Sequence, residues 1–149
     1  MFDFFLERGA DLSRKSPEGT PIQMAVAHQD ALFVDRLLQA GISADSTDEM
    51  GVPLVSTAYE NNLAEIADLF IGAGSNPNRS GGEDPSVVQK AFLGRDRDLF
   101  LQLVNRGGDI GQPLPDQSTM LEHVLAEGNH EWVELMLGVG ADPDQRSTH

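Results

Sequence analysis

Apolar residues recur along this chain at helical spacing, and glycine interrupts them at regular intervals. The interrupting residues are Gly9, Gly41, Gly74, Gly107 and Gly140, at intervals of 32, 33, 33 and 33 residues. Before each of the last four, apolar residues at positions i, i+1, i+4 and i+5 form one broad helical face. Glycine adopts the left-handed conformation that commonly ends a helix. Five helix ends at one period indicate a repeat array.

A shorter apolar segment precedes each of these helical stretches. The four segments span residues 22–27, 54–59, 87–93 and 120–126. The repeating unit is therefore a helix, a tight loop, a second helix, a terminating glycine and a long polar turn. A unit of this size cannot bury enough apolar surface alone and has to stack on its neighbours. The pattern predicts an all-α protein built from stacked helix-loop-helix repeats.

Short motifs within the unit resemble those of the ankyrin repeat family. The segment 19–22 (Gly-Thr-Pro-Ile) resembles the start of that family's first helix, and 140–144 (Gly-Ala-Asp-Pro-Asp) resembles its helix end. This resemblance implies an ankyrin-type solenoid whose repeats are joined by long turns. We expect a single domain over 1–149. Its parts are a partial repeat at 1–15, repeats at about 16–46, 47–79, 80–112 and 113–144, and a tail at 145–149.

The chain departs from the family pattern at several positions. The family's histidine, which bridges adjacent loops, is replaced by Gln23, Ser56, Gln89 and Glu122. We therefore expect these bridges to be altered or lost. The third repeat has the weakest motifs and is followed by an insertion at 111–116. The chain also starts inside a repeat, so either Met1 opens a short helix of unusual form or the chain is the later part of a longer protein.

Composition narrows the classes of ligand. The 149 residues contain 10 Lys plus Arg and 24 Asp plus Glu, which gives a formal net charge of −14, and there is no cysteine. An acidic protein is a poor ligand for nucleic acid or for an anionic membrane surface. Without cysteine there are no disulfides and no thiolate metal sites. No apolar run approaches the roughly 18 residues that span a bilayer. We expect a cytoplasmic protein.

A search for chemistry finds no catalytic or metal-binding motif. His123 and His130 are seven residues apart, but Gly128 and Asn129 interrupt any helix that would place them on one face. The acidic segment 45–51 lacks the ligand spacing of a calcium loop. Carboxylate pairs fall in expected exposed turns, where the pKa of a carboxyl is not raised for acid catalysis. We therefore expect no enzyme activity, no cofactor and no metal.

Acidic residues concentrate in parts of the chain. Residues 37–78 contain six acids and 107–144 contain eight, and neither stretch has a Lys or Arg. The resemblance implies a concave, partner-binding groove formed by the turn tips and the first helices. The corresponding residues here are Glu18, His28, Asp48, Glu49, Tyr59, Glu60, Asn61, Glu83, Asp84, Asp116, Gln117 and Glu127. A groove of one charge speeds the capture of a basic partner, although a net charge also simply maintains solubility.

These observations favour a protein-protein interaction module whose acidic concave surface captures another protein, and we expect that protein to have a basic surface. Tyr59 is the candidate aromatic anchor, and ordinary helix packing is its alternative role. The resemblance also implies an immunity protein, since small acidic ankyrin proteins of bacterial type neutralise toxic effector enzymes. The alternative is a scaffold segment of a larger ankyrin-repeat protein. We expect a monomer, or a weak dimer through exposed repeat ends.

The weak motifs of the third repeat generate a first prediction. We expect amide hydrogen exchange to be fastest around residues 81–94 and 107–117, because a poorly matched repeat opens locally at low free-energy cost. Exchange followed by mass spectrometry measures this directly. Uniform protection along the chain would contradict the prediction.

Overall fold

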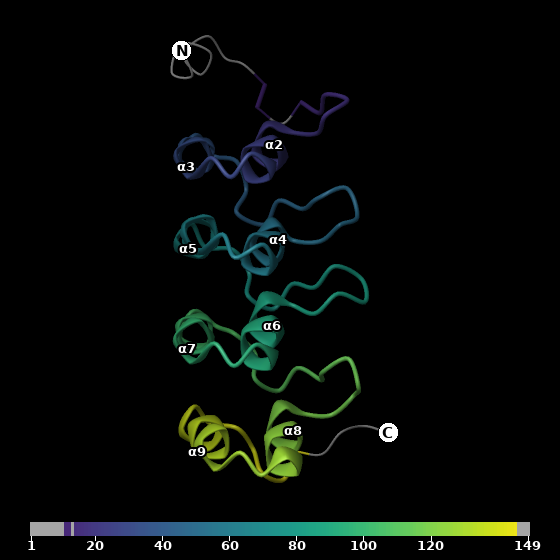
Figure 1. Cartoon of the computed structure of the whole chain (residues 1–149), viewed down its shortest axis with the longest axis vertical. Helices are drawn as coiled ribbons and strands as arrows, with labels where there is room; N and C mark the ends of the chain where they lie inside the picture. Colours follow the sequence, from purple (N-terminus) through teal and green to yellow (C-terminus); the bar gives the residue numbers. More distant parts are fainter. Residues whose placement is uncertain (1–10, 13, 146–149) are drawn as a thin grey trace. The chain divides into compact units, whose positions relative to one another are not determined.

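The computed structural model describes residues 11–12 and 14–145. Within them the chain forms short helices arranged in pairs, together with isolated antiparallel bridges in the long turns (Figure 1). The helices are α2 (Pro21–Ala27), α3 (Ala31–Gln39), α4 (Leu54–Glu60), α5 (Ala64–Gly72), α6 (Val87–Leu93), α7 (Arg97–Asn105), α8 (Met120–Glu127) and α9 (His130–Gly138). The expected all-α class is confirmed for this part of the chain.

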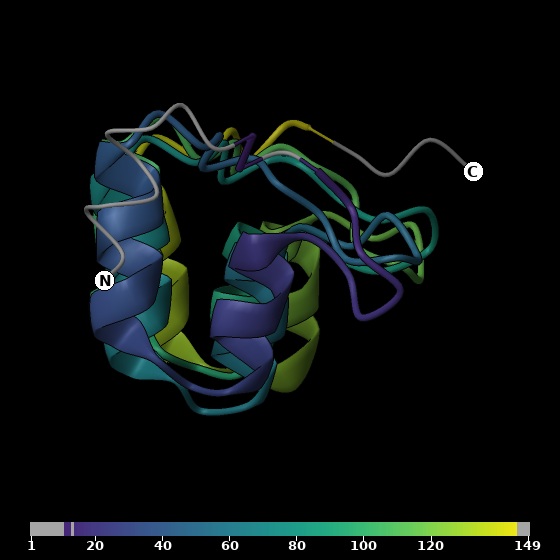
Figure 2. The same ribbon diagram turned by 90° about the horizontal axis from the view of Figure 1, so that it is seen from above.

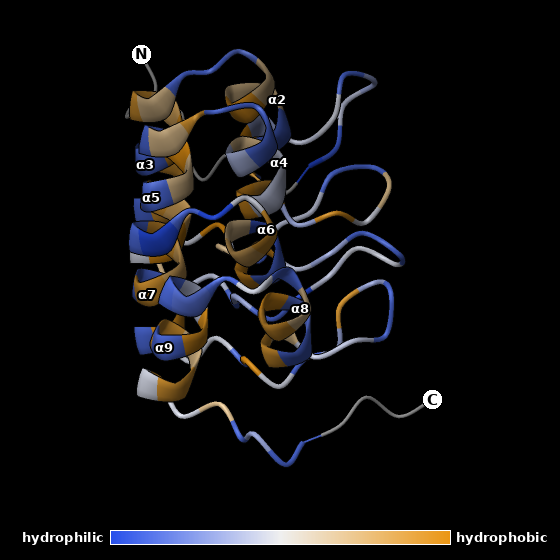
Figure 3. Cartoon of the chain, turned by 60° about the horizontal axis from the view of Figure 1, so that its bottom comes forward, coloured by the Kyte–Doolittle hydropathy of each residue, from blue (hydrophilic) through white to orange (hydrophobic). Residues whose placement is uncertain are grey.

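The helices fall into two compact units, divided between Asn76 and Pro77. In the first unit α2 packs on α3 and α4, and α5 packs on α3 and α4. In the second unit α6 packs on α7, and α8 packs on α9. Figure 2 shows that in each pair the long turn extends away from the helices on the side of the first helix. Hydrophilic residues predominate in these turns (Figure 3).

Each unit has its own apolar core between its helices. In the first unit the fully buried large side chains include Ile22, Leu37 and Phe70. In the second unit the corresponding residues include Phe92, Phe100 and Met136. Burial of one such side chain contributes about 1.5–3 kcal/mol. Helices of seven to nine residues are too short to be stable in isolation, so these contacts supply the stability that the single helices lack.

The described glycines that were expected to end helices do so. Gly41, Gly74, Gly107 and Gly140 have φ between +91° and +97°, a region that other residues adopt only at a cost. A second left-handed position recurs in the tight loop inside each helix pair. It is occupied by Gln29, Asn62, Arg95 and Gly128, with φ of 57°, 58°, 58° and 68°. A search for repeated glycine misses this position because only one of its four residues is glycine.

Most helices have a side-chain N-cap, but those of the second repeat do not. The carboxylates of Asp30 and Asp96 and the amide oxygen of Asn129 accept hydrogen bonds from the first turns of α3, α7 and α9. At the equivalent position α5 has Leu63, and α4 begins after Pro53. Each missing cap costs about 0.5–2 kcal/mol. The sequence motifs pointed to the third repeat as the weakest, whereas the caps are missing in the second.

In two repeats, a glutamine at the family's histidine position still bridges adjacent loops. Gln23 Nε2 donates to the carbonyl oxygen of Thr47 at 2.7 Å, and Gln89 Nε2 donates to that of Pro113 at 2.6 Å. The Oε1 atom of each glutamine accepts from the backbone N–H of its own helix's N-cap residue, at 2.8 Å. The buried hydroxyl of Ser56 has no hydrogen-bond partner among the described residues. Glutamine therefore reaches the next loop, while serine is too short.

The insertion after the third repeat is held by specific contacts. The Ser86 hydroxyl and Gln112 Oε1 are 2.9 Å apart, and Gln112 Nε2 donates to the carbonyl oxygen of Asn78 at 2.9 Å. A Cβ atom at Gly108 would lie 2.9 Å from the Leu103 carbonyl oxygen, so only glycine fits there. Helix α6 is also almost wholly buried. These contacts favour local opening confined to the turns rather than spread over α6.

Two expectations lie wholly or largely outside the described residues. Residues 1–10, 13 and 146–149 are not described. The partial repeat at 1–15, which includes Gly9, and the tail at 145–149 therefore remain predictions.

The double role of the bridging glutamine gives a second prediction. Gln89→Ala removes the hydrogen bonds to the Ser86 N–H and to the Pro113 carbonyl oxygen. Each is worth about 0.5–1.5 kcal/mol net, so we expect the free energy of unfolding to fall by about 1–3 kcal/mol. Gln89→Glu keeps the acceptor for the Ser86 N–H but loses the donor to Pro113, and should give an intermediate loss. Urea unfolding followed by circular dichroism measures both. Gln102→Ala on α7 is the control, and a loss as large as that of Gln89→Ala would contradict the assignment.

Candidate partner-binding site

The first unit contains a pocket between α2, α4 and the two turns that precede them. Its volume is about 320 Å³. Carboxylates, amides and apolar groups all line it. The lining residues are Glu18, Gln23, Val26, Ala27, Gln29, Asp48, Glu49, Leu54, Thr57, Asn61 and Leu63. Four of the predicted partner-binding residues, Glu18, Asp48, Glu49 and Asn61, therefore line one pocket.

Hydrogen bonds fix the acidic turn that closes this pocket. Asp48 Oδ1 accepts from the backbone N–H groups of Met50 at 2.8 Å and Val52 at 2.9 Å. The Asp48 N–H donates to the Val52 carbonyl oxygen at 2.8 Å, and Gly51 adopts φ +83° to close the turn. Met50 is left 86% exposed at the tip. The turn is therefore preorganised, with one oxygen of the Asp48 carboxylate committed to the backbone.

The neighbouring acid, Glu49, has a cationic partner. Lys15 Nζ lies 3.2 Å from Glu49 Oε1, and both side chains are more than half exposed. An exposed pair of this kind contributes about 0–1 kcal/mol. The carboxylate of Glu18 has no partner within the described part of the chain.

The second unit contains a larger pocket, of about 620 Å³, between its two long turns. Three predicted residues line it: Glu83, Asp84 and Gln117. The rest of the lining consists largely of proline and glutamine side chains. Lys90, only 8% exposed, places Nζ 2.6 Å from Asp84 Oδ2. The buried ammonium group offsets much of the negative charge on this pocket.

Two further predicted acids, Asp116 and Glu127, lie on either side of His123. Its Nδ1 is 3.8 Å from Asp116 Oδ2, and its Nε2 is 3.4 Å from Glu127 Oε1. Glu127 also forms an ion pair with Arg95. This group belongs to the second unit and joins α8 to the tight loop after α6.

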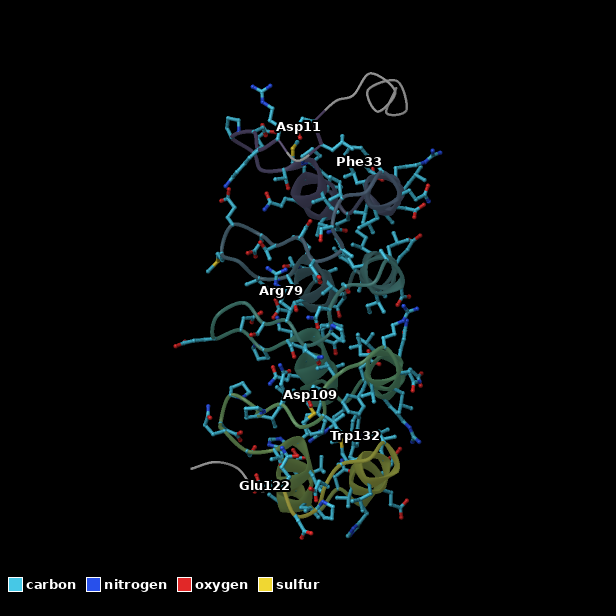
Figure 4. All side chains as sticks on the ribbon, turned by 180° about the vertical axis from the view of Figure 1, so that it is seen from behind. Asp11, Phe33, Arg79, Asp109, Glu122 and Trp132 are labelled. Carbon is cyan, nitrogen blue, oxygen red and sulfur yellow. The ribbon has the colours of Figure 1, made fainter. Side chains whose placement is uncertain are left out.

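The Arg95 guanidinium rests on aromatic rings. Its central carbon lies 4.9 Å from the centre of the Phe92 ring and 5.4 Å from that of Trp132. Trp132 lies between α7 and α9 (Figure 4), and its ring is 5.4 Å from that of Phe100. Cation–π contacts of this kind add about 0.5–1 kcal/mol each at exposed sites. Arg95 and Glu127 therefore act mainly in the packing of the second unit.

Hydrogen bonds from Ser118 lower the pKa of Asp116. The Ser118 hydroxyl donates at 2.6 Å and its backbone N–H at 2.9 Å to Asp116 Oδ1. The hydroxyl is the largest cause, the backbone N–H follows, and the nearby His123 adds a smaller effect. Asp116 is therefore ionised at neutral pH.

The remaining predicted residues, His28, Tyr59 and Glu60, line neither pocket. His28 is the exposed C-cap of α2, Tyr59 is half-buried on α4, and Glu60 is exposed. On this side the pocket is lined by Thr57 of α4 and by Asn61, the C-cap residue one helical turn later.

Sequence reasoning missed the three cations that pair with predicted acids: Lys15, Lys90 and Arg95. Each of these pairs joins residues six or more apart in the sequence. Lys90 gave one weak signal, because it is a charged residue inside the apolar segment 87–93.

Within the described residues, no group of three or more His, Asp or Glu side chains is placed to hold a metal ion. No helix in the same part of the chain is long and apolar enough to cross a membrane.

The structure is similar to the crystal structure of an ankyrin repeat domain from Acinetobacter baumannii AYE, with a TM-score of 0.70. The chain has the ankyrin-repeat fold. The similarity covers 82% of this chain and 62% of that domain, at 22% sequence identity. The ankyrin-type chain thus spans less than two thirds of that domain's length. No protein-family model and no curated protein matches the sequence.

The environment of Asp116 gives a third prediction. Ser118→Ala removes the largest cause of the lowered pKa, so the pKa of the Asp116 carboxyl should rise towards its ordinary value. Ser118→Thr keeps the hydroxyl and serves as the control. Because the folded-state pKa lies below the unfolded value, the associated stability is lost as pH falls through it, and the Ala variant should lose less. Carboxyl-carbon NMR titration measures the pKa, and an unchanged value in the Ala variant would contradict the assignment.

Proposed function

We propose that the chain is a non-enzymatic protein-binding module whose acidic surface takes a partner protein with a basic surface. The observation that carries this proposal is the pocket of the first unit, where Glu18, Asp48 and Glu49 surround an apolar floor. A concave site with apolar lining and a few convergent polar groups is the usual form of a binding site. The acidic rim gives that site a preference for positive charge.

The internal ion pairs reduce this acidity without removing it. Glu49, Asp84 and Glu127 have basic partners, whereas Glu18 has none among the described residues. The whole chain still has a formal net charge of −14. Such a charge raises the rate at which a basic partner is encountered.

Enzyme activity is left out of the proposal because of where the carboxylates lie. A general acid at neutral pH requires a carboxyl whose pKa is raised by burial or by a neighbouring negative charge. The pKa of Asp116 is lowered instead, and Glu18, Glu49, Glu83 and Glu127 are exposed.

A narrower form of the proposal is that the partner is a toxic effector enzyme and the chain is its immunity protein. This form is supported only by the resemblance of a small acidic chain to bacterial ankyrin proteins. It requires that a captured partner be an enzyme and that the purified chain inhibit it at equal molar ratio. A captured partner whose activity is unaffected would remove the immunity role and leave the binding module.

The acidic rim gives a fourth prediction. In Glu18→Lys/Glu49→Lys the charge of the rim is reversed, and Asp48 is left in place because its carboxylate holds the turn. Capture of a basic protein from an extract of the native cells should be abolished, since like charges then face each other. Glu65→Lys/Asp68→Lys is the matched control, because both residues are exposed on α5 and line no part of the pocket. Immobilised protein and mass spectrometry of the salt eluate measure capture.

Capture by the unchanged chain should also weaken when salt rises from about 50 to about 500 mM, because the Debye length then shortens severalfold. Equal capture by both double variants, or capture that is independent of salt, would defeat the acidic surface as the binding site. A partner consisting only of copies of the chain would favour the scaffold alternative.

A further inference from the structure

We propose that the pocket between α2 and α4 holds the side chain of one arginine of the partner protein. This inference rests on the proposed function and names the group that the acidic surface recognises. It combines three features of the same pocket: an apolar floor, a carboxylate rim and open acceptor atoms.

The floor suits the aliphatic part of an arginine side chain. Val26 and Leu54, which are 4% and 2% exposed, lie at the base, and Ala27 and Leu63 add further apolar lining. Arginine buries its methylene groups along apolar surface while its charged end stays near polar groups. An apolar partner side chain would leave the carboxylates without compensation, and an acidic one would be repelled by them.

The rim suits the guanidinium group. Glu18 has no partner among the described residues, and within them the turn binds Asp48 through its Oδ1 atom. The Asn61 amide donates to the Thr57 carbonyl oxygen at 2.8 Å, which directs its nitrogen to the helix. A guanidinium has five donors in a planar fork and matches carboxylates better than the compact ammonium group of lysine.

One cation of the chain itself lies beside this rim. The ammonium group of Lys15 lies 3.2 Å from Glu49 but is not part of the pocket lining. Both side chains are exposed, so the pair is weak and leaves the pocket accessible. The pocket of the second unit differs, because the buried Lys90 already occupies the Asp84 carboxylate there. The arginine is therefore assigned to the first unit alone.

The test is an NMR titration of the full-length, isotope-labelled chain at low salt with N-acetyl-arginine amide. The neutral isostere N-acetyl-citrulline amide and the cation N-acetyl-lysine amide are the comparison probes. The arginine probe should shift the amide signals of residues that line the pocket, among them Ala27, Thr57 and Asn61. Citrulline should give several-fold smaller shifts at the same concentration, and lysine should lie between the two.

Three variants separate charge from shape. Glu18→Gln/Asp48→Asn removes two charges but keeps an acceptor for the Asp48 turn, and should reduce the arginine-induced shifts several-fold. Glu65→Gln/Asp68→Asn makes the same charge change on α5 and should leave them unchanged. Ala27→Leu adds bulk at the edge of the pocket without altering charge and should also reduce them. Far-ultraviolet circular dichroism and thermal unfolding establish that each variant is folded.

Equal shifts from citrulline and arginine would overturn the proposal, as would shifts spread over acidic residues of both units. Lysine shifts as large as those of arginine would also overturn it, because the pocket would then select charge rather than the guanidinium group. If the arginine test fails while partner capture still depends on Glu18 and Glu49, only this inference falls. If arginine binds the pocket but no basic partner is captured, the proposed function is the part that fails.

Discussion

The whole structure depends on the inability of a single helix pair to bury its own apolar face. Its helices are seven to nine residues long, so each is marginal in isolation. Phe70, Phe92 and Phe100 are completely buried, and in the second unit Phe92 and Phe100 pack against Trp132 of the next pair. Because stability resides in these contacts, every turn has to return the chain in the same register. The left-handed residues serve that return and repeat at about 33 residues. The N-caps and bridging glutamines serve it in the repeats that have them.

The same constraint explains where a binding site can form. The helix faces that stack are buried in the core, while the long turns and the outer face of the first helices remain accessible. Asp48 is fixed by two backbone N–H donors and Asn61 by its bond to Thr57. These side chains are held in place by the turns and helices that the stack requires. A site of this kind is rigid before a partner arrives, which lowers the conformational cost of binding.

Charge on the acidic surface is less uniform than the sequence indicates. Lys90 is buried against Asp84, and Arg95 joins Glu127 while resting on Phe92 and Trp132. Such pairs stabilise the second unit and decrease its attraction for a cation. In the first unit the exposed Lys15–Glu49 pair lies beside the pocket. Lys90 and Arg95 therefore neutralise two predicted partner-binding acids of the second unit, Asp84 and Glu127.

The sequence by itself determined the period, the helices and the glycines that end them, because these depend on local conformational preference and on spacing along one chain. It also determined that the three acids Glu18, Asp48 and Glu49 and the amide Asn61 belong to the turns and to the end of a first helix. Only the tertiary structure decided that Glu18, Asp48, Glu49 and Asn61 share a pocket that excludes Tyr59. It alone decided which acids are neutralised. The physical reason is that both outcomes depend on distances between side chains far apart in the sequence, and these distances are set by packing.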